Sequence, residues 1–282
     1  MININKQNLA ILIITYNPSN NLELLVNKCS KLSNYIYVID NGSSDVSNLQ
    51  FLSNIANDIV KLIRLKENKG IGTAVNMTIS LIDTNIVKWL LTFDQDSLPP
   101  DNLLNNYDRI LSEENQVALI GINYLHDNAN NNCHFSYTNS LDLITSGTLH
   151  NLRILDIIGK YNEKLFIDCV DFEINLRANL AGYKTIMLTT SHLEHTIGNP
   201  KSIRICGFTL ESMNHNAFRQ YYIVRNHIWL LKKYIFRSPL YIINKFYHLM
   251  IRLIKTMIID DDKSSKLKSI SKGLIDGIKY SM

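Results

Sequence analysis

The 282-residue sequence predicts an α/β fold with a doubly wound, mostly parallel central sheet and a C-terminal amphipathic helical extension. Three observations support this prediction. Short apolar runs rich in β-branched residues recur through the first hundred residues, as expected for strands buried on both faces. Segments suited to helices separate these runs, which is the spacing of βαβ units in a parallel sheet. After residue 218, bulky apolar and aromatic residues are interleaved with Arg and Lys.

The first half of the chain contains most of the regular pattern. Four runs are predicted as strands: 10–15, 35–40, 59–64 and 87–93. Helices are expected between them, over 22–32, after the polar loop 41–45, and over 73–82. In a doubly wound sheet, ligands bind at the carboxyl ends of the strands, where the strand order reverses. The polar clusters that follow these strands are therefore expected to face one crevice.

The middle of the chain is less regular. Helices are expected over 151–158 and 171–181, the second ending at Gly182 as a helix C′ residue would. A strand-like run follows at 185–189. No linker divides the first 218 residues, so the predicted organisation is one body over 1–218, with halves of about 1–100 and 101–218, and a separate region over 219–282.

The net charge of +4 conceals an asymmetry between these two regions. Residues 1–218 carry 16 Lys/Arg and 21 Asp/Glu, whereas residues 219–282 carry 13 and 4. A basic tail indicates contact with an anionic surface, and the acids at strand ends argue against nucleic acid. The aromatic, basic segment 218–259 could lie in a membrane interface or pack on the body, and the sequence leaves both open.

Targeting signals and cysteines place few further limits. No run of about 18 apolar residues predicts a transmembrane helix, and no signal peptide is evident, so a cytoplasmic protein is expected. The four cysteines have no short spacing typical of zinc ligands, and buried thiols are expected.

Asp94-Gln95-Asp96, a DxD motif, is the sharpest local signal for chemistry. Two carboxylates fixed at the end of a buried strand can hold Mg²⁺ or Mn²⁺, which also binds phosphate oxygens. The alternative is an ordinary acidic surface loop.

Three further acids, Asp168, Asp171 and Glu173, crowd the start of a predicted helix. The helix dipole favours carboxylates there, but a carboxylate in a cleft is also a natural general base for a sugar hydroxyl. His192 and His195 follow the strand 185–189 and are either structural or, for His195, a metal ligand. The Gly70–Ala74 loop is a poor dinucleotide motif but suits a close approach of backbone to a nucleotide.

In this order, the motifs resemble the inverting family-2 glycosyltransferases, specifically their rhamnosyltransferase-like branch. The similarity spans about residues 9–235. It rests on eight segments: ILIITYNPSNNL, YVIDNGSSD, NKGIGTAVN, FDQDS, ITSGTLHNL, LFIDCVDFEINLRANLAGYK, HLEHTIG and FRQYYIVRNHIWLLKKY. The resemblance implies the nucleotide-diphospho-sugar transferase fold of the A type, with a nucleotide-binding half over about 1–100 and an acceptor half over about 101–218.

The resemblance also implies roles for individual residues. Asp171 would be the catalytic base, with Asp168 or Glu173 as a possible second acid, and Asp96 and His195 would bind the metal, Mn²⁺ or Mg²⁺. Arg225 and Asn226 match a conserved pair of uncertain role, and Cys169 stands where many relatives have an aromatic residue. The donor would contact a larger set: Thr15, Tyr16, Asn17, Asp40, Asn68, Gly70, Asn76, Asp94 and Gln95.

The implied activity is transfer of L-rhamnose from dTDP-L-rhamnose, with inversion, in the synthesis of O-antigen (the lipopolysaccharide side chain) or another bacterial surface polysaccharide. The acceptor would be a glycan on a polyprenyl diphosphate, used by a protein peripherally bound to the inner face of the membrane. Alternatives are a related transferase that uses UDP-galactose, UDP-glucose or UDP-GlcNAc and, more distantly, a Mg²⁺-dependent phosphohydrolase or a basic binding module without catalysis.

Overall fold

The computed structural model describes residues 4–54, 59–124, 135–195, 201–205 and 208–279. The chain forms two compact units. Unit 1 comprises Met1–Glu163 and Asp171–Thr196, and unit 2 comprises Lys164–Val170 and Ile197–Met282. The chain therefore leaves unit 1 for seven residues before it returns to form a helix.

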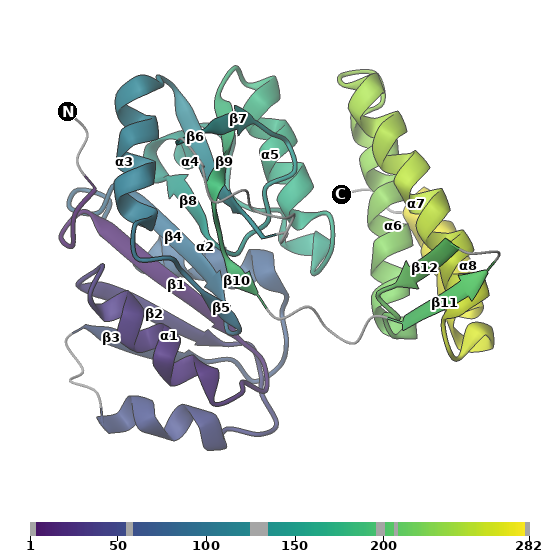
Figure 1. Ribbon diagram of the computed structural model, residues 1–282, viewed down its shortest axis with the longest axis horizontal. Helices are drawn as coiled ribbons and strands as arrows, with labels where there is room; N and C mark the ends of the chain where they lie inside the picture. Colours follow the sequence, from purple (N-terminus) through teal and green to yellow (C-terminus); the bar gives the residue numbers. More distant parts are fainter. Residues whose placement is uncertain (1–3, 55–58, 125–134, 196–200, 206–207, 280–282) are drawn as a thin grey trace. The chain divides into compact units, whose positions relative to one another are not determined.

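Unit 1 is built on an eight-stranded sheet (Figure 1). Its strand order is β3-β2-β1-β4-β8-β6-β9-β7. Strands β1, β2, β3 and β4 are parallel to one another, β6 is parallel to β9, and β8 and β7 run antiparallel to their neighbours. The strands are β1 (Leu9–Thr15), β2 (Tyr35–Asp40), β3 (Val60–Arg64), β4 (Trp89–Asp94), β6 (Val117–Asn123), β7 (Tyr137–Asn139), β8 (Thr148–Asn151) and β9 (Lys184–His192).

The sheet is covered by helices because its central strands are apolar on both faces. All seven residues of β1 are buried. Helices α1 (Asn21–Ser30) and α3 (Leu103–Glu113) pack their apolar faces onto one side of the sheet in a shared core, and α2 (Ile71–Leu81) lies on the other (Figure 1). The remaining helices of this part of the chain are α4 (Leu152–Ile158), α5 (Val170–Leu180) and the 3₁₀ turns η1 (Ser47–Asn54) and η2 (Glu163–Leu165).

The strand order reverses between β1 and β4. From β1 the chain adds β2 and β3 on one side, and then returns to add β4 on the other. The carboxyl ends of β1, β2 and β4 consequently lie at one edge of the sheet, on either side of the switch point where such folds bind ligands. This placement confirms the predicted fold class.

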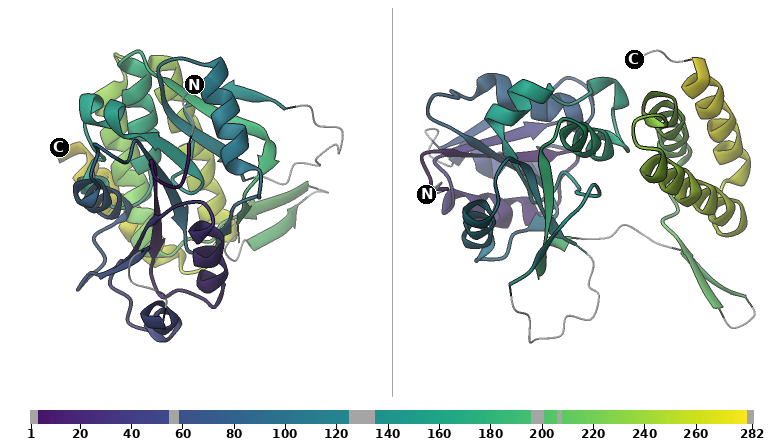
Figure 2. Two further views of the ribbon diagram at one scale, coloured as in Figure 1. Left: turned by 90° about the vertical axis from the view of Figure 1, so that its left-hand side faces the viewer. Right: turned by 90° about the horizontal axis from the view of Figure 1, so that it is seen from above.

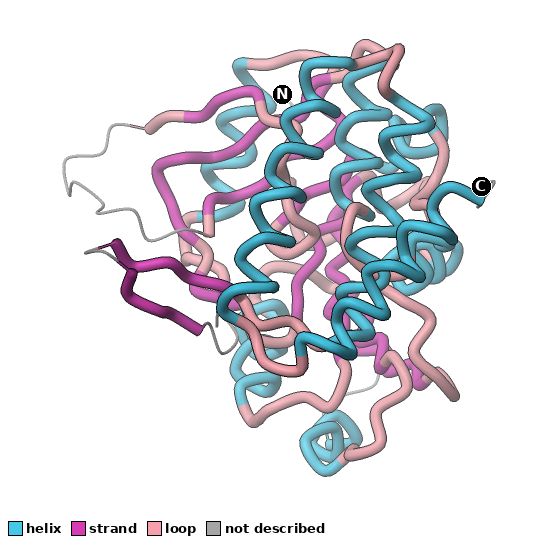
Figure 3. The backbone as a smooth tube through the Cα atoms, turned by 90° about the vertical axis from the view of Figure 1, so that its right-hand side faces the viewer, coloured by secondary structure: helices cyan, strands magenta, loops and turns pink. Residues whose placement is uncertain are grey.

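The described residues of unit 2 from 201 to 279 form three helices and a β-hairpin. Helices α6 (Ala217–Tyr234), α7 (Pro239–Ile259) and α8 (Lys263–Lys279) lie side by side, and β11 (Lys201–Ile205) pairs with β12 (Phe208–Ser212) (Figures 2 and 3). Gly273 and Gly277 let α8 approach α6 closely: a Cβ at Gly273 would lie 2.6 Å from the Tyr221 carbonyl oxygen. Within the described residues, none of the helices is both long and apolar enough to cross a membrane.

Several expected elements differ from those observed. The helix expected after the loop 41–45 is the 3₁₀ turn η1, because only one buried leucine per turn, Leu49 and Leu52, anchors it to the core. His192, expected beyond its strand, is the last residue of β9. Residue 218, where the composition changes, is the second residue of α6.

Candidate active site

The loop after β1 is tied to the loop after β2. Asn17 has a left-handed backbone (φ 48°), and its side-chain oxygen accepts from Ser44 N at 2.9 Å and from Asp45 N at 3.2 Å. Its own backbone N–H donates to the Ser43 hydroxyl at 2.7 Å. Thr15 is buried at the end of β1, whereas Tyr16 beside it is half exposed. Of the three residues expected in the base pocket, Tyr16 and Asn17 are exposed, and the Asn17 side chain is bonded to the loop after β2.

Asp40 is fully buried at the end of β2. Its carboxylate accepts from the Ser43 backbone N–H at 3.2 Å, from the Ser43 hydroxyl, and from Arg64 Nε at 3.4 Å. Burial of this acid is tolerated because each oxygen has a donor. Asp40 therefore fixes the 40–43 turn of the nucleotide-binding half.

The loop 66–70 is held against this turn at short range. Asn41, which the sequence did not single out, accepts from the Lys69 N–H at 2.8 Å. Gly42 has φ 81°, and a Cβ there would lie 2.5 Å from the Glu67 carbonyl carbon. Asn68 accepts from the Gly70 N–H at 2.9 Å, immediately before α2 begins.

Asn76 on α2 holds the segment that leads out of unit 1. Its side chain donates to the Tyr161 carbonyl oxygen at 2.9 Å and to Glu163 at 2.7 Å, and it accepts from Tyr161 N at 2.9 Å. These bonds occupy the amide fully, so Asn76 shapes the site by positioning residues 161–163.

The DxD corner is joined to the β1 loop by Gln95. Its side-chain oxygen accepts from the Tyr16 N–H at 2.7 Å, and its side-chain nitrogen donates to the Tyr16 carbonyl at 3.2 Å. Gln95 thus clamps one peptide of the loop after β1 to the end of β4. The motif residue between the two aspartates has a structural role.

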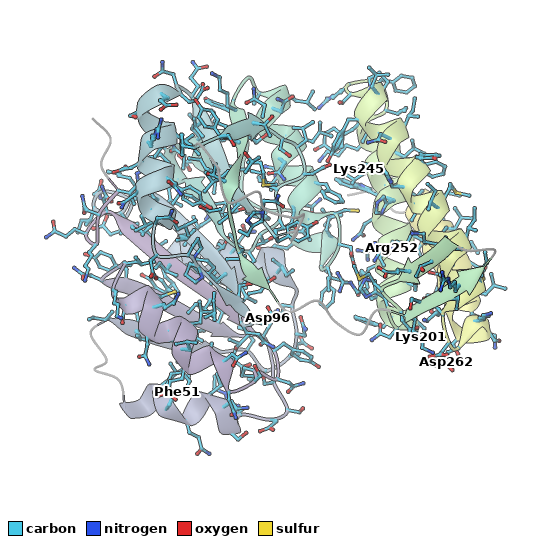
Figure 4. All side chains as sticks on the ribbon, in the orientation of Figure 1. Phe51, Asp96, Lys201, Lys245, Arg252 and Asp262 are labelled. Atoms are coloured by element: carbon cyan, nitrogen blue, oxygen red, sulfur yellow. The ribbon has the colours of Figure 1, made fainter. Side chains whose placement is uncertain are left out.

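Asp96 lies next to a short strand pair that brings the HLEH segment to it (Figure 4). Strand β5 (Ser97–Leu98) pairs with β10 (Glu194–His195), with Ser97 opposite His195. The backbone of His195 is therefore directly across from the residue that follows Asp96. The His195 side chain lies outside the described part of the structure.

Asp171 is connected to the same corner through two consecutive residues. The Thr145 hydroxyl donates to the Asp171 carboxylate. The next residue, Ser146, accepts from the Asp94 N–H at 3.0 Å and donates to the Ser97 hydroxyl at 2.7 Å. The acids of β4 and α5 therefore converge on one turn of unit 1.

That turn is rigidly built. Gly147 has φ 74°, its N–H donates to the Thr92 carbonyl at 2.7 Å, and its own carbonyl accepts from the buried Tyr107 hydroxyl at 2.5 Å. The Thr92 hydroxyl in turn donates to the Thr145 carbonyl. Such support is what a site needs to hold a carboxylate in a fixed orientation.

The residues present suit a hard divalent cation as part of its coordination shell. Asp94 and Asp96 supply carboxylate oxygens at the end of β4, and diphosphate oxygens from a substrate would supplement them. Among the side chains that the structure describes, no cluster of three or more His, Cys, Asp or Glu residues forms a metal site by itself. The β5–β10 pairing brings the backbone of His195 opposite Ser97, the residue after Asp96.

Comparison with known protein families decides the class of protein. The model of glycosyl transferase family 2 matches residues 10–178. This chain belongs to glycosyl transferase family 2. The matched range holds the β1 loop, the DxD corner, the Thr145–Ser146 turn and Asp171, and membership excludes the phosphohydrolase and pure binding alternatives.

Relatives of this family-2 transferase agree with its fold and class. It is 27% identical over 294 residues to the dTDP-rhamnosyl transferase RfbF of Shigella flexneri, covering 96% of both chains. The mannosyltransferase PcManGT of Pyrobaculum calidifontis, solved with GDP-Man and Mn²⁺, superposes with a TM-score of 0.62 at 12% identity, over 98% of this chain and 77% of that one. S. aureus TarS 1–349 gives 0.53 at 14% identity, over 97% and 72%. The fold is therefore that of the A-type transferases.

Glu173 and Asp168, the two other acids considered, are engaged elsewhere. Glu173 is buried and paired with Arg177 at 2.8 Å, and Arg177 also donates to the carbonyl oxygens of residues 158, 159 and 160. Asp168 belongs to unit 2, where Arg219 binds both of its oxygens, at 2.9 and 3.3 Å. Each carboxylate thus has a structural partner of opposite charge.

Arg225 and Asn226 on α6 hold the segment 164–168. Asn226 donates to the carbonyl oxygens of Leu165, Ile167 and Asp168, each at 2.8 Å, and Arg225 donates to that of Lys164 at 2.7 Å. The segment needs such support because Phe166, Asp168 and Cys169 all have positive φ, near 60°. Cys169 lies buried against His227, with Sγ 3.2 Å from Nδ1.

A cavity of about 550 Å³ elsewhere in unit 1 does not belong to this site. Its lining is mainly apolar and lies near the edge strand β3, with Leu49, Leu52 and Leu81 among the residues. It contains none of the polar groups described above, so the chemistry is placed at the strand ends instead.

Proposed function

We propose that this family-2 transferase moves L-rhamnose from dTDP-L-rhamnose to a glycan hydroxyl with inversion at the anomeric carbon. The likeness to a dTDP-rhamnosyl transferase over 96% of both chains supports the donor. The observation that carries the chemistry is the linkage of Asp171 through Thr145 and Ser146 to Asp94 and Ser97. A general base beside a diphosphate-binding corner is the arrangement that transfer of a sugar from a nucleotide diphosphate requires.

In this proposal Asp171 is the general base. The acceptor hydroxyl gives its proton to the Asp171 carboxylate as its oxygen bonds to the anomeric carbon. The bond from that carbon to the diphosphate oxygen breaks on the opposite face, and dTDP leaves with the electron pair. The Thr145 hydroxyl orients the carboxylate, and such base assistance contributes about 10²–10⁴ in rate.

The donor would be held at the switch point of the sheet. Thr15, Tyr16 and Asn17 would line the base and ribose, Asp40 would stabilise that pocket, and the Asn68–Gly70 loop with Asn76 would shape the sugar side. Asp94, Asp96 and His195 would hold Mn²⁺ or Mg²⁺. When bound, the cation neutralises the charge that grows on the departing diphosphate.

We place the acceptor on a polyprenyl diphosphate lipid at the inner face of the membrane. The reaction would then extend an O-antigen or another surface polysaccharide. The 13 Lys/Arg against 4 Asp/Glu in residues 219–282 support an anionic, membrane-bound acceptor.

The experiment that tests the donor is a panel of nucleotide sugars assayed with Mn²⁺, with Mg²⁺ and with EDTA. We expect dTDP-L-rhamnose to raise the thermal midpoint and to be turned over with either ion, and EDTA to stop turnover. If UDP-galactose, UDP-glucose or UDP-GlcNAc is turned over and dTDP-L-rhamnose is not, the proposed donor is wrong, but the protein remains a glycosyltransferase. Full activity in EDTA would show that the reaction does not require a divalent cation.

A further inference from the structure

Helix α7 carries an apolar stripe that the fold of unit 2 does not cover. Its inward residues, such as Ile242 and Leu249, are buried in the helical unit. On the outward side, exposed apolar residues recur at intervals of three and four, the spacing of one helix face. The stripe comprises Leu240, Ile243, Tyr247, Met250, Ile254 and Ile258. Leu240 is 85% exposed and Tyr247 is 61% exposed.

Further exposed apolar residues lie on the elements next to α7 in the chain. Phe236, in the turn before α7, is 96% exposed. On α8, Leu267, Leu274 and Ile278 are exposed at the same helical spacing. A groove of about 320 Å³ joins the two helices, lined entirely by apolar residues: Leu253, Ile254, Met257, Ile258, Leu267 and Ile270. We call these residues of α7 and α8, with Phe236, the apolar face of unit 2.

An apolar face of this extent is unusual for a protein surface that stays in water. Single exposed apolar residues are normal, but contiguous patches mark sites that contact lipid or another protein. Leu24, Ile86 and Ile157 of unit 1 are examples of single exposed residues, because they lie on three separate elements or loops.

Basic side chains border the apolar face. Arg237 follows Phe236, Lys255 follows Ile254, and Lys268 follows Leu267. Lys263 lies beside the end of the stripe, with its Nζ 3.1 Å from the Ile258 carbonyl oxygen. Long basic side chains beside apolar ones can extend to anionic headgroups while the apolar neighbours enter the lipid.

Two of the four acids in the same region are paired with lysines within the unit. Residues 236–279 carry nine Lys/Arg and four Asp. Asp260 pairs with Lys266 at 2.9 Å in the interior, and Asp261 pairs with Lys201 at 2.5 Å. Asp276 accepts from the Tyr221 hydroxyl at 2.8 Å. The border of the apolar face is therefore positive.

We infer that the apolar face of unit 2 is the surface with which the protein docks on an anionic membrane. The occupant is a lipid surface because positive charge borders the face, whereas two copies of it would bring like charges together. The inference rests on the proposed function in that a lipid-linked acceptor requires the enzyme at the membrane. It goes beyond that function by assigning the contact to the α7 stripe and the α8 residues beside it.

The test is flotation of the full-length protein with vesicles of phosphatidylcholine alone and with 30% phosphatidylglycerol. The variant is Ile243→Glu/Tyr247→Glu/Ile254→Glu, and its matched control is Leu24→Glu/Ile86→Glu/Ile157→Glu, which changes the same kind of exposed residue by the same charge in unit 1. A second variant, Ile243→Ser/Tyr247→Ser/Ile254→Ser, leaves the charge unchanged.

We expect the parent to bind the anionic vesicles at least tenfold more strongly than the neutral ones. Both α7 variants should lose at least tenfold in binding, and the control should stay within twofold of the parent. Binding of the α7 variants at the parent level would overturn the inference, as would a parent that binds neither vesicle. A parental dimer that becomes monomeric in the variants, with vesicle binding unchanged, would assign the face to self-association instead.

Release of dTDP with a water-soluble acceptor separates the two proposals. All four proteins should release dTDP at the same rate. Vesicle binding without any release of dTDP would reject the rhamnosyl donor and leave the docking surface standing. Release of dTDP without vesicle binding would reject the docking surface and leave the rhamnosyl donor standing.

Discussion

At the residue scale, the proposed reaction depends on how one carboxylate, that of Asp171, is oriented. Thr145 donates to Asp171, and Ser146 beside it binds the DxD corner at the Asp94 N–H. The other acids of the same sequence cluster have structural partners: Arg177 for Glu173 and Arg219 for Asp168. Asp171 is thus the acid of the cluster whose described partner is a hydroxyl of the site itself.

Asp171→Asn tests this assignment. The amide keeps an oxygen for the Thr145 hydroxyl but cannot take the acceptor proton, so we expect kcat to fall by about 10²–10⁴. The dissociation constant for dTDP-L-rhamnose should change little, as measured by titration calorimetry. Near-normal turnover in this variant would reject Asp171 as the base, and Thr145→Val, which removes only the orienting hydroxyl, should lose less.

Three histidines with lowered pKa values give the stability of the protein a pH dependence. Burial lowers the pKa of His150 in unit 1 to about 4, and likewise lowers the pKa of His215 and His227 in unit 2 to about 4. His150 is neutral: one ring nitrogen donates to the Leu90 carbonyl at 3.0 Å, so the other accepts from the Tyr161 hydroxyl at 2.7 Å.

His150→Gln should flatten the pH dependence of unfolding. The unfolded chain binds a proton near pH 6.5 and the folded chain only near pH 4, so the stability from His150 is complete above pH 6.5 and declines as the pH falls toward 4. One such group contributes a slope of up to about 1.4 kcal/mol per pH unit. Urea unfolding followed by tryptophan fluorescence at pH 7 and pH 5 measures it. If the pH dependence of the unfolding free energy is the same in the variant as in the parent, His150 is not held in its neutral form.

At the element scale, the sequence predicted the regular pieces well because each is a local pattern. The four parallel strands β1 to β4 lie within two residues of their expected limits. The apolar, β-branched runs of β1, β2 and β4, which are buried on both faces, are distinctive. The antiparallel insertion of β8 between β4 and β6 was not expected, because its pairing is a long-range contact that four residues do not encode locally.

The sequence predicted those site residues that directly follow strands. It did not predict the contacts between residues that are far apart in the chain. The acids of the DxD motif and Asp171 could be named from the sequence and the family resemblance. The Thr145–Ser146 turn and Asn41 carried no local sign of their partners, because these are 26 to 52 residues away. For the same reason the role of Arg225 and Asn226 was open: their partners in 164–168 lie about 60 residues earlier in the chain.

Asn226→Leu tests whether α6 holds that segment. Leucine fills a similar volume but removes the donor to three carbonyl oxygens, so we expect unfolding to become easier by roughly 1–3 kcal/mol. Proteolytic cleavage should appear near Phe166, where the backbone has a positive φ and the Asn226 bonds to the flanking carbonyl oxygens would be lost. Asn216→Ala, which removes only the cap of the same helix at Arg219 N, is the control and should not expose that segment. Equal cleavage in both variants would mean that α6 as a whole, and not Asn226, protects the segment.

At the scale of the whole molecule, the C-terminal region and the base are linked through the chain. Helix α8 packs on α6 through Gly273 and Gly277, α6 holds residues 164–168, and residue 170 precedes the base. The residues proposed to bind the donor all belong to unit 1. A defect in α8 should therefore lower kcat more than it weakens binding of the donor.

Truncation after Asp262 tests this link. Removal of α8 uncovers the surface of α6 around Tyr221 and Ile228, so we expect kcat to fall several-fold while the dissociation constant for the donor stays within twofold. Kinetics with a water-soluble acceptor, combined with donor titration, measures both quantities. A matched fall in donor affinity would show that unit 1 itself depends on α8.

The excursion of residues 164–170 into unit 2 has a consequence for engineering. Because the chain crosses between the units at 163/164, 170/171 and 196/197, no single cut separates them into continuous halves. A hybrid that takes its C-terminal helices from a relative must also import the seven-residue excursion, so that Arg225 and Asn226 meet the backbone they were matched to. A graft joined only at residue 196 would combine helix α6 of the relative with residues 164–170 of this chain. Loss of activity in such a hybrid would reflect the mismatch between this helix and this segment, and not the acceptor preference of the relative.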